Sequence, residues 1–387
     1  NDVGESASEC KSKLGDLSVS DVAIPPEASF PRRCGASHLS RRREPKSPSR
    51  LDAVTSLWPR APGACAPINR RAALLGLSAA AFGLPLALAF DSTAAPLAYK
   101  LTPIPIAEGV WMIAGVPEAI STANGGAIAN VTILDTKAGA VIVDSGPSKR
   151  YGEALAKLAG ELTGKPVVRV YLTHFHPDHV FGNQAFAPQA LATTQKVADG
   201  LKRMGDDFAA AMYRTAGDWM RGTEVVLPET IVTAGVEDFG DRKLRLVPLS
   251  GHTDSDLAIL DERSGLLFAG DLVFLDRAAT TPNAELESWR ASLAALGALG
   301  HTRLVPGHGP AEAGTRGITQ TGDWLALVEG TISDAFGRGL DVLEARDLPL
   351  PPWAEKIALA RYEFERSVMH LYPKLEAKGL PRVDRKA

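Results

Sequence analysis

Short apolar runs alternate with amphipathic segments from about Leu101 to Gly314. The apolar runs are rich in Val, Ile and Leu and are bounded by Gly, Asp or Pro, a pattern typical of buried strands. The predicted strands are Gly109–Ala114, Ala127–Leu134, Ala140–Asp144, Val167–Thr173, Leu244–Leu249, Leu257–Leu260 and Leu266–Ala269. The amphipathic segments predict helices over Lys149–Leu162, Thr194–Trp219 and Leu286–Leu299. Because each half of this region runs through strands into a helix, a layered α/β sandwich is favoured over one open sheet.

Residues 315–387 are predicted to form a helical C-terminal extension. Its helices cover Ile318–Phe336 and Pro352–Leu375, and the sequence LPLPP separates them. Aromatic side chains of this extension are expected to pack it onto the sandwich, with a minority lining a substrate cleft: Trp324, Trp353, Tyr362, Phe364 and Tyr372. The segment Met204–Gly222 has the same two interpretations, of which core packing is favoured.

The N-terminal part of the chain differs in composition from the rest. Residues 1–66 are rich in Ser, Pro, Arg and Ala, which predicts a disordered extension or one added by a mis-assigned start. Residues 67–90 contain a twin arginine, an apolar run and a small-x-small end at Ala87–Ala89, and they resemble a twin-arginine (Tat) export signal. We therefore expect a periplasmic or exported protein with no stable membrane span after signal cleavage. An uncleaved anchor, and an anion-binding arm at the basic run 40–50, are the alternatives.

Charge and cysteine content narrow the functions open to the main region. The 387 residues carry a formal net charge of −3, and those after Arg71 hold 30 basic and 37 acidic residues. This balance provides no basic surface for nucleic acid. The three cysteines, Cys10, Cys34 and Cys65, all precede the main region, so a metal site there must use His, Asp and Glu.

The densest group of metal-binding side chains follows the apolar run VVRVYLT. The sequence THFHPDHVFGN begins at Thr173 and contains three histidines and an aspartate: His174, His176, Asp178 and His179. A tight turn stiffened by proline, with a helix starting after it, aims these side chains into one cavity. Neutral imidazoles and carboxylates are ligands that zinc accepts. A set of polar residues that merely caps the helix is the alternative.

Three further polar residues each follow a short apolar strand and a glycine. They are His252 in SGHT, Asp271 in AGD and His308 in PGHG. The glycine permits a sharp turn that directs the next side chain off the edge of the sheet. One such residue alone is more often a turn residue than a ligand, but five of the eight histidines fall in motifs of this design. His301 and His370 lie outside the motifs and are expected to be structural or surface groups.

Taken in order, HxHxDH, GHT, GD and PGHG resemble the metallo-β-lactamase superfamily over about Leu101–Ala313. The resemblance implies an αβ/βα four-layer sandwich over residues 98–314, with metals at one edge of its two sheets. One metal would be held by His174, His176 and His252, and the other by Asp178, His179 and His308. Asp271 would bridge the two metals. Asp144, in VDSG, would orient the metal loop, or would be a simple turn residue.

The resemblance implies a hydrolase with two zinc ions per chain and a small-molecule substrate, and iron or manganese are the alternative metals. A bridging hydroxide would attack the substrate, and Asp178 and Asp271 would be the catalytic carboxylates. β-Lactamases of this superfamily usually lack an aspartate at the bridging position. Asp271 therefore favours an ester, thioester, lactone or related bond over a lactam.

Four stretches are similar to the zinc metallohydrolases associated with quinoprotein (pyrroloquinoline quinone) dehydrogenases. They are PIAEGVWMIAG, THFHPDHVFGNQAF, GDWLALVEGTI and ARYEFERSVMHLY. This similarity implies an association with such a dehydrogenase. Two other functions stay open: an enzyme like the mononuclear iron persulfide dioxygenases, and a periplasmic partner of the dehydrogenase in which the metals are structural.

Overall fold

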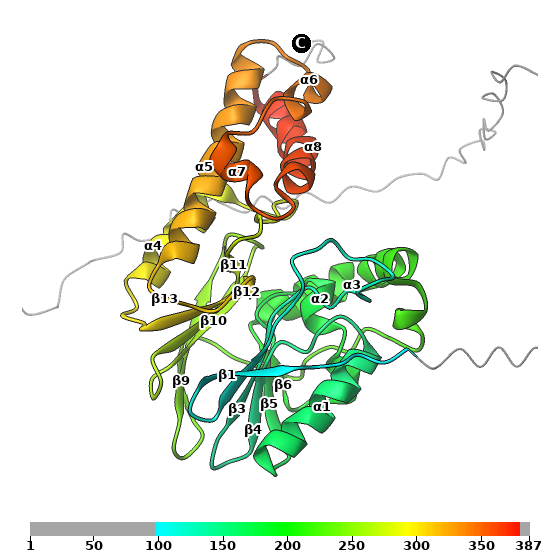
Figure 1. The fold of residues 1–387 in the computed structure, drawn as a ribbon, viewed down its shortest axis with the longest axis vertical. Coiled ribbons are helices and arrows are strands. Elements are labelled where there is room, and N and C mark those ends of the chain that lie inside the picture. The colour runs from blue at the N-terminus through cyan, green and yellow to red at the C-terminus, as the bar shows by residue number, and fades with distance from the viewer. Residues whose placement is uncertain (1–96, 380–387) are drawn as a thin grey trace, which may run out of the picture. The chain divides into compact units, whose positions relative to one another are not determined.

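Two β-sheets packed face to face form the centre of the protein in a computed structural model that describes residues 97–379 (Figure 1). The seven-stranded sheet runs in the order of the chain through β1 (Pro103–Ala107), β2 (Val110–Ile113), β3 (Val131–Asp135), β4 (Ala140–Val143), β5 (Val167–Tyr171), β6 (Leu191–Thr193) and β7 (Thr230–Ile231). The six-stranded sheet has the order β13 (Glu312–Ala313), β12 (Arg303–His308), β11 (Leu266–Phe274), β10 (Asp256–Asp261), β9 (Lys243–Leu249) and β8 (Gly235–Asp238). The predicted extension 1–66 and the signal-like segment 67–90 lie outside the described residues.

Helices cover the outer face of each sheet. On the first sheet lie α1 (Lys149–Thr163) and α3 (Gln195–Ala216), and on the second lie α4 (Leu286–Gly297) and α5 (Arg316–Gly337) (Figure 1). Shorter helical turns are α2 (Pro177–Val180), η1 (Asn183–Ala185) and η2 (Gly217–Met220). The predicted αβ/βα four-layer sandwich is therefore confirmed.

Each central strand is buried on both faces, and alternate side chains serve different cores. In β10, Leu257 and Ile259 point between the sheets, whereas Ala258 and Leu260 point toward the helices on the second sheet. This is the period-two alternation of a strand. Because both faces are apolar, the sequence of such a strand is a continuous hydrophobic run rather than an alternating one. That property explains why the central strands were predicted well from the sequence.

The structure corrects several predicted boundaries. Residues 127–130 form turns rather than the start of β3, and the strand predicted to end at Ala269 continues to Phe274. The single helix predicted over Pro352–Leu375 is divided into α7 (Pro352–Glu355) and α8 (Ala360–Gly379). Leu359 has a positive φ of 61°, which a continuous helix does not permit.

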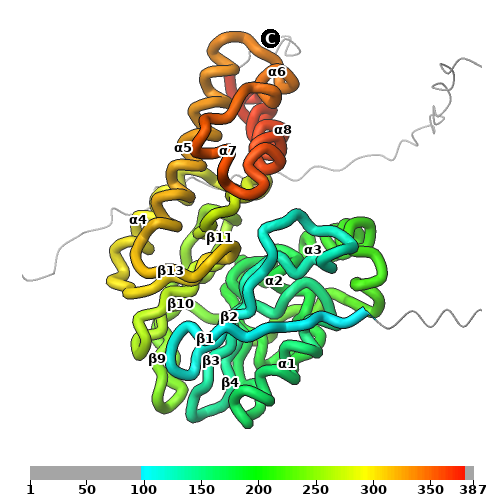
Figure 2. Tube along the Cα trace, viewed as in Figure 1, coloured from blue at the N-terminus to red at the C-terminus, as the bar shows by residue number. Residues whose placement is uncertain are grey.

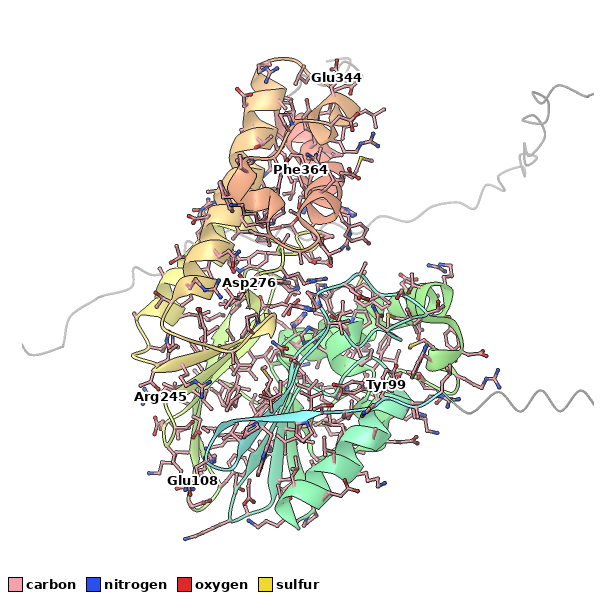
Figure 3. The ribbon with its side chains drawn as sticks, in the orientation of Figure 1. Tyr99, Glu108, Arg245, Asp276, Glu344 and Phe364 are labelled. Atoms are coloured by element: carbon pink, nitrogen blue, oxygen red, sulfur yellow. The ribbon has the colours of Figure 1, made fainter. Side chains whose placement is uncertain are left out.

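The C-terminal extension is helical, as predicted, and shares a core with the second sheet. Its elements are α5, α6 (Val342–Arg346), α7 and α8. Trp324 and Tyr372 are almost fully buried, and Phe364 is completely buried where it points into the helical bundle (Figure 3). Trp353 and Tyr362 remain 43% and 47% exposed, so these two do not join the core. Within residues 97–379, no helix is long and apolar enough to span a membrane.

A long loop connects β2 to β3 and lies beside α3 (Figure 2). Two hydrogen bonds fix it. Tyr99 Oη donates to Gly125 O at 2.7 Å, and Trp219 Nε1 donates to Thr122 O at 2.9 Å. The loop carries Ile120 and Ile128, which matter for the site described next.

Candidate metal centre

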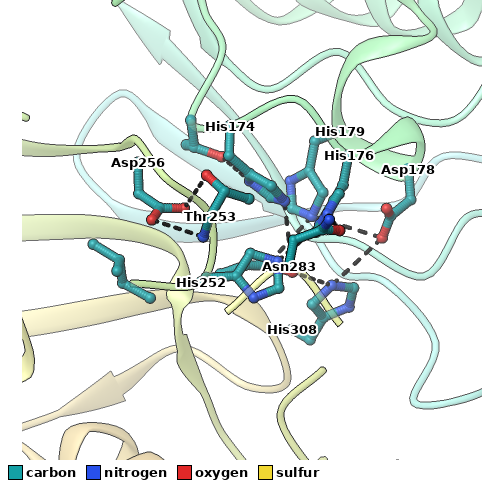
Figure 4. Close-up of polar contacts among 12 residues, drawn as sticks. His174, His176, Asp178, His179, His252, Thr253, Asp256, Asn283 and His308 are labelled. Atoms are coloured by element: carbon teal, nitrogen blue, oxygen red, sulfur yellow. Dashed lines mark hydrogen bonds and ion pairs between the residues drawn. The ribbon is translucent and has the colours of Figure 1, made fainter. Parts of the chain in front are cut away.

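Five histidines and two aspartates meet at one edge of the two sheets. Figure 4 labels the five histidines and Asp178 of this group. They come from the loop after β5, from α2, from the β9–β10 loop, from β11 and from the last residue of β12. The donor atoms form two groups, and within each group all donor atoms lie within 4.8 Å of one another. The first group is His174, His176, His252 and Asp271, and the second is Asp178, His179 and His308. All seven predicted residues are thus brought together; each group contains one of the two predicted trios, and Asp271 falls in the first group.

Local chain geometry explains why four of these side chains converge. His176 is in extended conformation, and Pro177 then starts the short helix α2. Proline is tolerated there, because a backbone N–H at the first position of a helix has no partner within the helix. Asp178 and His179 follow within the first turn of that helix. The His179 carbonyl accepts hydrogen bonds from the amides of Ser145 and Gly146, at 2.7 and 3.2 Å, which anchor α2 to the end of β4.

Four of the five imidazoles have one ring nitrogen held by an oxygen, which leaves the other nitrogen facing the centre. The oxygen partners are Thr173 Oγ1 for His174 Nδ1 at 3.0 Å, Asn283 Oδ1 for His176 Nε2 at 2.9 Å, Asp144 Oδ2 for His179 Nδ1 at 2.8 Å, and Ile128 O for His308 Nδ1 at 2.8 Å. Such outer hydrogen bonds fix the tautomer and orientation of metal-binding histidines. The inward nitrogens are therefore placed as lone-pair donors.

Asp144 lies at the end of β4 with a positive φ of 63° and accepts three hydrogen bonds. Its Oδ1 accepts from the Thr173 amide at 2.8 Å, and its Oδ2 accepts from Thr173 Oγ1 at 2.9 Å and from His179 Nδ1. The carboxylate thus joins the β5 loop to α2, the contact expected of a residue that orients the metal loop.

Asp271 occupies the space between the two donor groups. Its carboxylate oxygens lie 3.2 Å from His252 Nε2, 3.8 Å from His174 Nε2, 3.1 Å from His179 Nε2 and 3.3 Å from His308 Nε2. Two atoms bound to one tetrahedral zinc at about 2.0 to 2.2 Å are separated by about 3.3 to 3.6 Å. The spacing of these donors therefore suits ligands that share an ion.

Several inward atoms lack any hydrogen-bond partner among the described residues. They are His174 Nε2, His179 Nε2 and Asp271 Oδ1. His176 Nδ1 and His252 Nε2, two ring nitrogens, face each other at 2.8 Å. Buried polar atoms are normally paired, and a bound cation would supply the missing partner of the three unpaired atoms. The donor set therefore fits metal ions, and the known preference of zinc for imidazole and carboxylate fits this composition.

Electrostatics also favour metal ligation. Burial lowers the pKa of His174, His176 and His252 below the ordinary value, so these imidazoles are neutral at pH 7. Burial alone would raise the pKa of Asp271, but His308 and His179, the strongest influences among the neighbouring histidines, hold it well below its usual range. His179 is the exception. Burial opposes its protonation, yet the carboxylates of Asp271, Asp178 and Asp144 together raise its pKa well above the ordinary value.

Two glycines create the space that Asp271 needs. A Cβ on Gly307 would lie 1.9 Å from Asp271 Oδ1, so any side chain there would displace the carboxylate. Gly270 has a positive φ of 52°, and a Cβ there would meet Thr173 Cβ at 2.7 Å. Asp271 therefore lies within β11, at an irregularity in its pairing with β12, and not after the end of a strand as predicted. Glycine is required at position 307 because the Asp271 carboxylate lies so close to it, and not because the chain turns sharply there.

Three residues around the site are not among the site residues predicted from the sequence. Thr173 and Asn283 bind histidines, as described above, and Asp256 accepts hydrogen bonds from the Thr253 amide at 3.1 Å and from Thr253 Oγ1 at 3.2 Å, beside His252 (Figure 4). Burial raises the pKa of Asp256 well above its ordinary value. Asn283 lies in the loop before α4, and only the fold brings that loop to His176. No spacing rule would have identified it.

The candidate metal centre forms the floor of a cavity of about 500 Å³. His176, Asp178, Asp271 and His308 line this floor, while Phe208 and Met212 of α3 and Ile120 and Ile128 of the β2–β3 loop line an apolar wall. The opposite wall belongs to the C-terminal extension and the loop after β11, with Arg277, Tyr362, Glu363, Arg366 and His370. The exposed Tyr362 thus lines the cleft, as a minority of the aromatics of the extension was expected to do. A larger and more open hollow elsewhere contains none of the seven candidate ligands.

The chain is similar in sequence to known proteins over the same region. Residues 124–308 match the Metallo-beta-lactamase superfamily. The Beta-lactamase-like protein 2 homolog of Caenorhabditis elegans is 26% identical over 183 residues, which are 47% of this chain and 56% of that protein. The human Acyl-coenzyme A thioesterase MBLAC2 is 25% identical over 166 residues, 38% of this chain and 58% of that protein. The chain therefore spans just over half the length of these curated relatives.

Solved structures share the fold. A Beta-lactamase domain protein from Burkholderia ambifaria superposes with a TM-score of 0.53 at 20% identity, over 76% of this chain and 93% of that one. The sec-alkylsulfatase Pisa1 from Pseudomonas sp. gives a TM-score of 0.56 at 16% identity, over 74% of this chain and 52% of that one. The similarity to the quinoprotein-associated group stays a prediction. Because the family match, the four-layer sandwich and the converging motifs coincide, the domain that contains residues 124–308 is a member of the metallo-β-lactamase superfamily.

Proposed function

We propose that the protein is a zinc-dependent hydrolase that binds two zinc ions and cleaves a thioester or a related acyl ester. The observation that carries the proposal is the position of Asp271, whose carboxylate faces both groups of histidines from the floor of a cavity. A site closed on all sides by protein ligands would be structural, whereas catalytic zinc sites keep a position open to substrate. The cavity above the donors supports catalysis.

A related protein supports the thioester class. The human relative is named an acyl-coenzyme A thioesterase, and its similarity covers part of both chains. An acyl group also suits the apolar wall formed by Phe208, Met212 and Ile120.

The protein groups have distinct tasks in the proposed reaction. His174, His176 and His252 would hold one zinc, Asp178, His179 and His308 would hold the other, and Asp271 would contact both. When bound, two zinc ions polarise a carbonyl oxygen and lower the pKa of water toward neutrality.

The carboxylates Asp178 and Asp271 lie at the floor as acceptors that orient the attacking water. A carbon–oxygen bond to the acyl carbon forms and the carbon–sulfur bond breaks, and the proton of the water passes to the departing thiolate. The apolar wall restricts access of other water to the acyl carbon.

The test is a substrate panel on the zinc-loaded full chain. It comprises an aryl thioester, an aryl ester, a lactone, an alkyl sulfate, a phosphodiester and a cephalosporin. We expect the thioester to have a kcat/KM at least about 100-fold above that of the cephalosporin, and we expect His176→Ala to abolish hydrolysis. Zinc-loaded protein that hydrolyses only the cephalosporin, or no acyl substrate at all, would refute the proposal.

A further inference from the structure

Arg277 is a buried cation on the wall of the cavity. Its side chain is 4% exposed, and it follows the end of β11 by only a few residues. Within the described part of the chain, its Nε and Nη1 atoms have no hydrogen-bond partner. A guanidinium removed from water without partners is strongly unfavourable for folding. Such a group is retained where something else supplies the missing partner.

The nearest carboxylate does not satisfy Arg277. Glu363 Oε1 lies 3.7 Å from Arg277 Nη2, which is beyond hydrogen-bonding distance. Both Glu363 oxygens instead accept from Arg366 Nη1, at 3.1 and 2.9 Å. The wall therefore carries two guanidinium groups and one carboxylate, and one positive charge is left over. His370 adds no further positive charge, because burial and the neighbouring Arg366 and Lys374 lower its pKa and it is neutral at pH 7.

The guanidinium of Arg277 lies close to the candidate metal centre. Its Cζ atom is 5.7 Å from the centre of the Phe274 ring, and the His308 ring stacks on the same phenyl ring at 5.0 Å with an angle of 11°. One aromatic ring thus links Arg277 to a candidate metal ligand. The backbone around Arg277 is fixed, because the Ala278 amide donates to Ala358 O at 2.9 Å and the Ala358 amide donates to Asp276 O at 3.1 Å.

We propose that Arg277 is an anion-binding residue of the substrate site, supported by Arg366, and that the substrate is an acyl compound with an anionic group a few bonds from the cleaved bond. The anion would be a carboxylate or a tetrahedral oxyanion, since the planar fork of arginine binds both. The identity of the hydrolysed bond rests on the proposed function, whereas the inference of an anion subsite rests on the observations on Arg277 alone. The apolar wall of Phe208 and Met212 would contact the chain between the anion and the acyl carbon.

The first experiment compares three S-phenyl thioesters of equal chain length on the zinc-loaded full chain. They are the thioesters of hexanoic acid, of adipic acid through one carboxyl, and of an equally long acid that ends in a sulfonate. We expect one or both anionic substrates to exceed the hexanoate in kcat/KM by about 10- to 100-fold. In Arg277→Met this ratio should fall to near one. Arg338→Met, in an exposed pair with Asp334 on α5, is the control and should keep the wild-type ratio.

The second experiment measures binding without turnover. Calorimetry compares the affinities of adipate and hexanoate. Both offer one carboxylate to the metals, so the difference between the two affinities reports the second carboxylate of adipate alone. We expect adipate to bind the zinc-loaded wild type at least about 10-fold more tightly than hexanoate, and we expect Arg277→Met to remove that preference. Where the sulfonate thioester is the preferred anionic substrate, the matching sulfonate product replaces adipate. The melting temperature of Arg277→Met should be unchanged or higher, because a buried charge with unsatisfied hydrogen-bond donors is removed.

The outcomes separate the two proposals. Zinc-loaded wild type that hydrolyses none of the thioesters, yet prefers the dianion in an Arg277-dependent manner, refutes the hydrolase and supports the anion subsite. Thioester hydrolysis with no preference for an anion, or with a preference that survives Arg277→Met, refutes the subsite. A lower melting temperature for Arg277→Met with an unchanged substrate ratio shows that Arg277 is structural and also refutes it.

Discussion

Asn283 Oδ1 lies 2.9 Å from His176 Nε2, and this contact ties a candidate metal ligand to the loop before α4. The same loop is held by the C-terminal extension. Thr281 Oγ1 donates to Ser367 Oγ of α8 at 2.7 Å, and Trp324 Nε1 of α5 donates to Ala279 O at 3.0 Å. The helical extension therefore supports the position of His176 through a short chain of hydrogen bonds.

Replacing Asn283 should weaken metal binding without removing a ligand. In Asn283→Leu the His176 ring loses the acceptor that fixes its tautomer, so zinc affinity should fall about 10- to 100-fold. Competition with a chromogenic chelator measures this change. Asn283→Asp keeps an acceptor oxygen and should retain near wild-type affinity. Equal affinity in all three proteins would show that the contact has no role in metal binding.

The core of the C-terminal extension should depend on Phe364 of α8, which is completely buried in the core that α8 shares with α5. Phe364→Ala removes an aromatic ring from a packed core and should lower the free energy of unfolding by about 3 to 5 kcal/mol. Urea denaturation measures the loss. Leu343→Ala on the same extension changes a side chain that is 53% exposed and should alter stability by less than about 0.5 kcal/mol. Similar effects of the two substitutions would contradict the described packing.

Tyr99 should contribute to the loss of stability at alkaline pH. Burial raises its pKa to about 12, above the ordinary value of 10, so the folded protein holds this proton more tightly than the unfolded chain. The contribution is fully present below pH 10 and is lost as the pH rises from 10 to 12. A phenolate also has no proton to donate to Gly125 O, which anchors the loop beside the cavity.

Denaturation curves between pH 9 and 12 test this assignment. Tyr99→Phe should be less stable than the wild type at pH 9, because it lacks the hydrogen bond, and its stability should fall less steeply with pH. Tyr213→Phe, at a position 45% exposed on α3, should follow the wild-type curve. If the stability of Tyr99→Phe fell with pH as steeply as that of the wild type, the raised pKa of Tyr99 would be refuted.

The sequence predicted the metal centre better than its surroundings. His174, His176, Asp178 and His179 occur in one dense motif, and their convergence depends on a local turn before α2. His252 and His308 lie far away along the chain, but each is preceded by an apolar strand and a glycine, a repeated local pattern. Such patterns act over a few residues and are therefore visible in the sequence.

Residues that depend on tertiary packing were not predictable in this way. Asn283 and Arg277 reach the cavity because the second sheet and the extension place their loops there. The short edge strands β7, β8 and β13 are defined by pairing with neighbours and have little hydrophobic signal of their own. The continuation of β11 through Asp271 depends on pairing with β12, and glycine at position 270 had indicated a turn instead.

The central claim is that Asp271 joins two metal sites. The most direct test is to measure the metal content of the zinc-loaded wild type and of zinc-loaded Asp271→Asn by elemental mass spectrometry. Asn keeps the shape of the side chain and removes its charge, while Asp334→Asn, in an exposed pair, serves as the control. We predict about two zinc ions per chain for wild type and control, at most about one for Asp271→Asn, and a fall in kcat/KM of at least about 100-fold for that variant. A single iron per chain in the protein as purified, or two zinc ions and full activity in Asp271→Asn, would contradict the account.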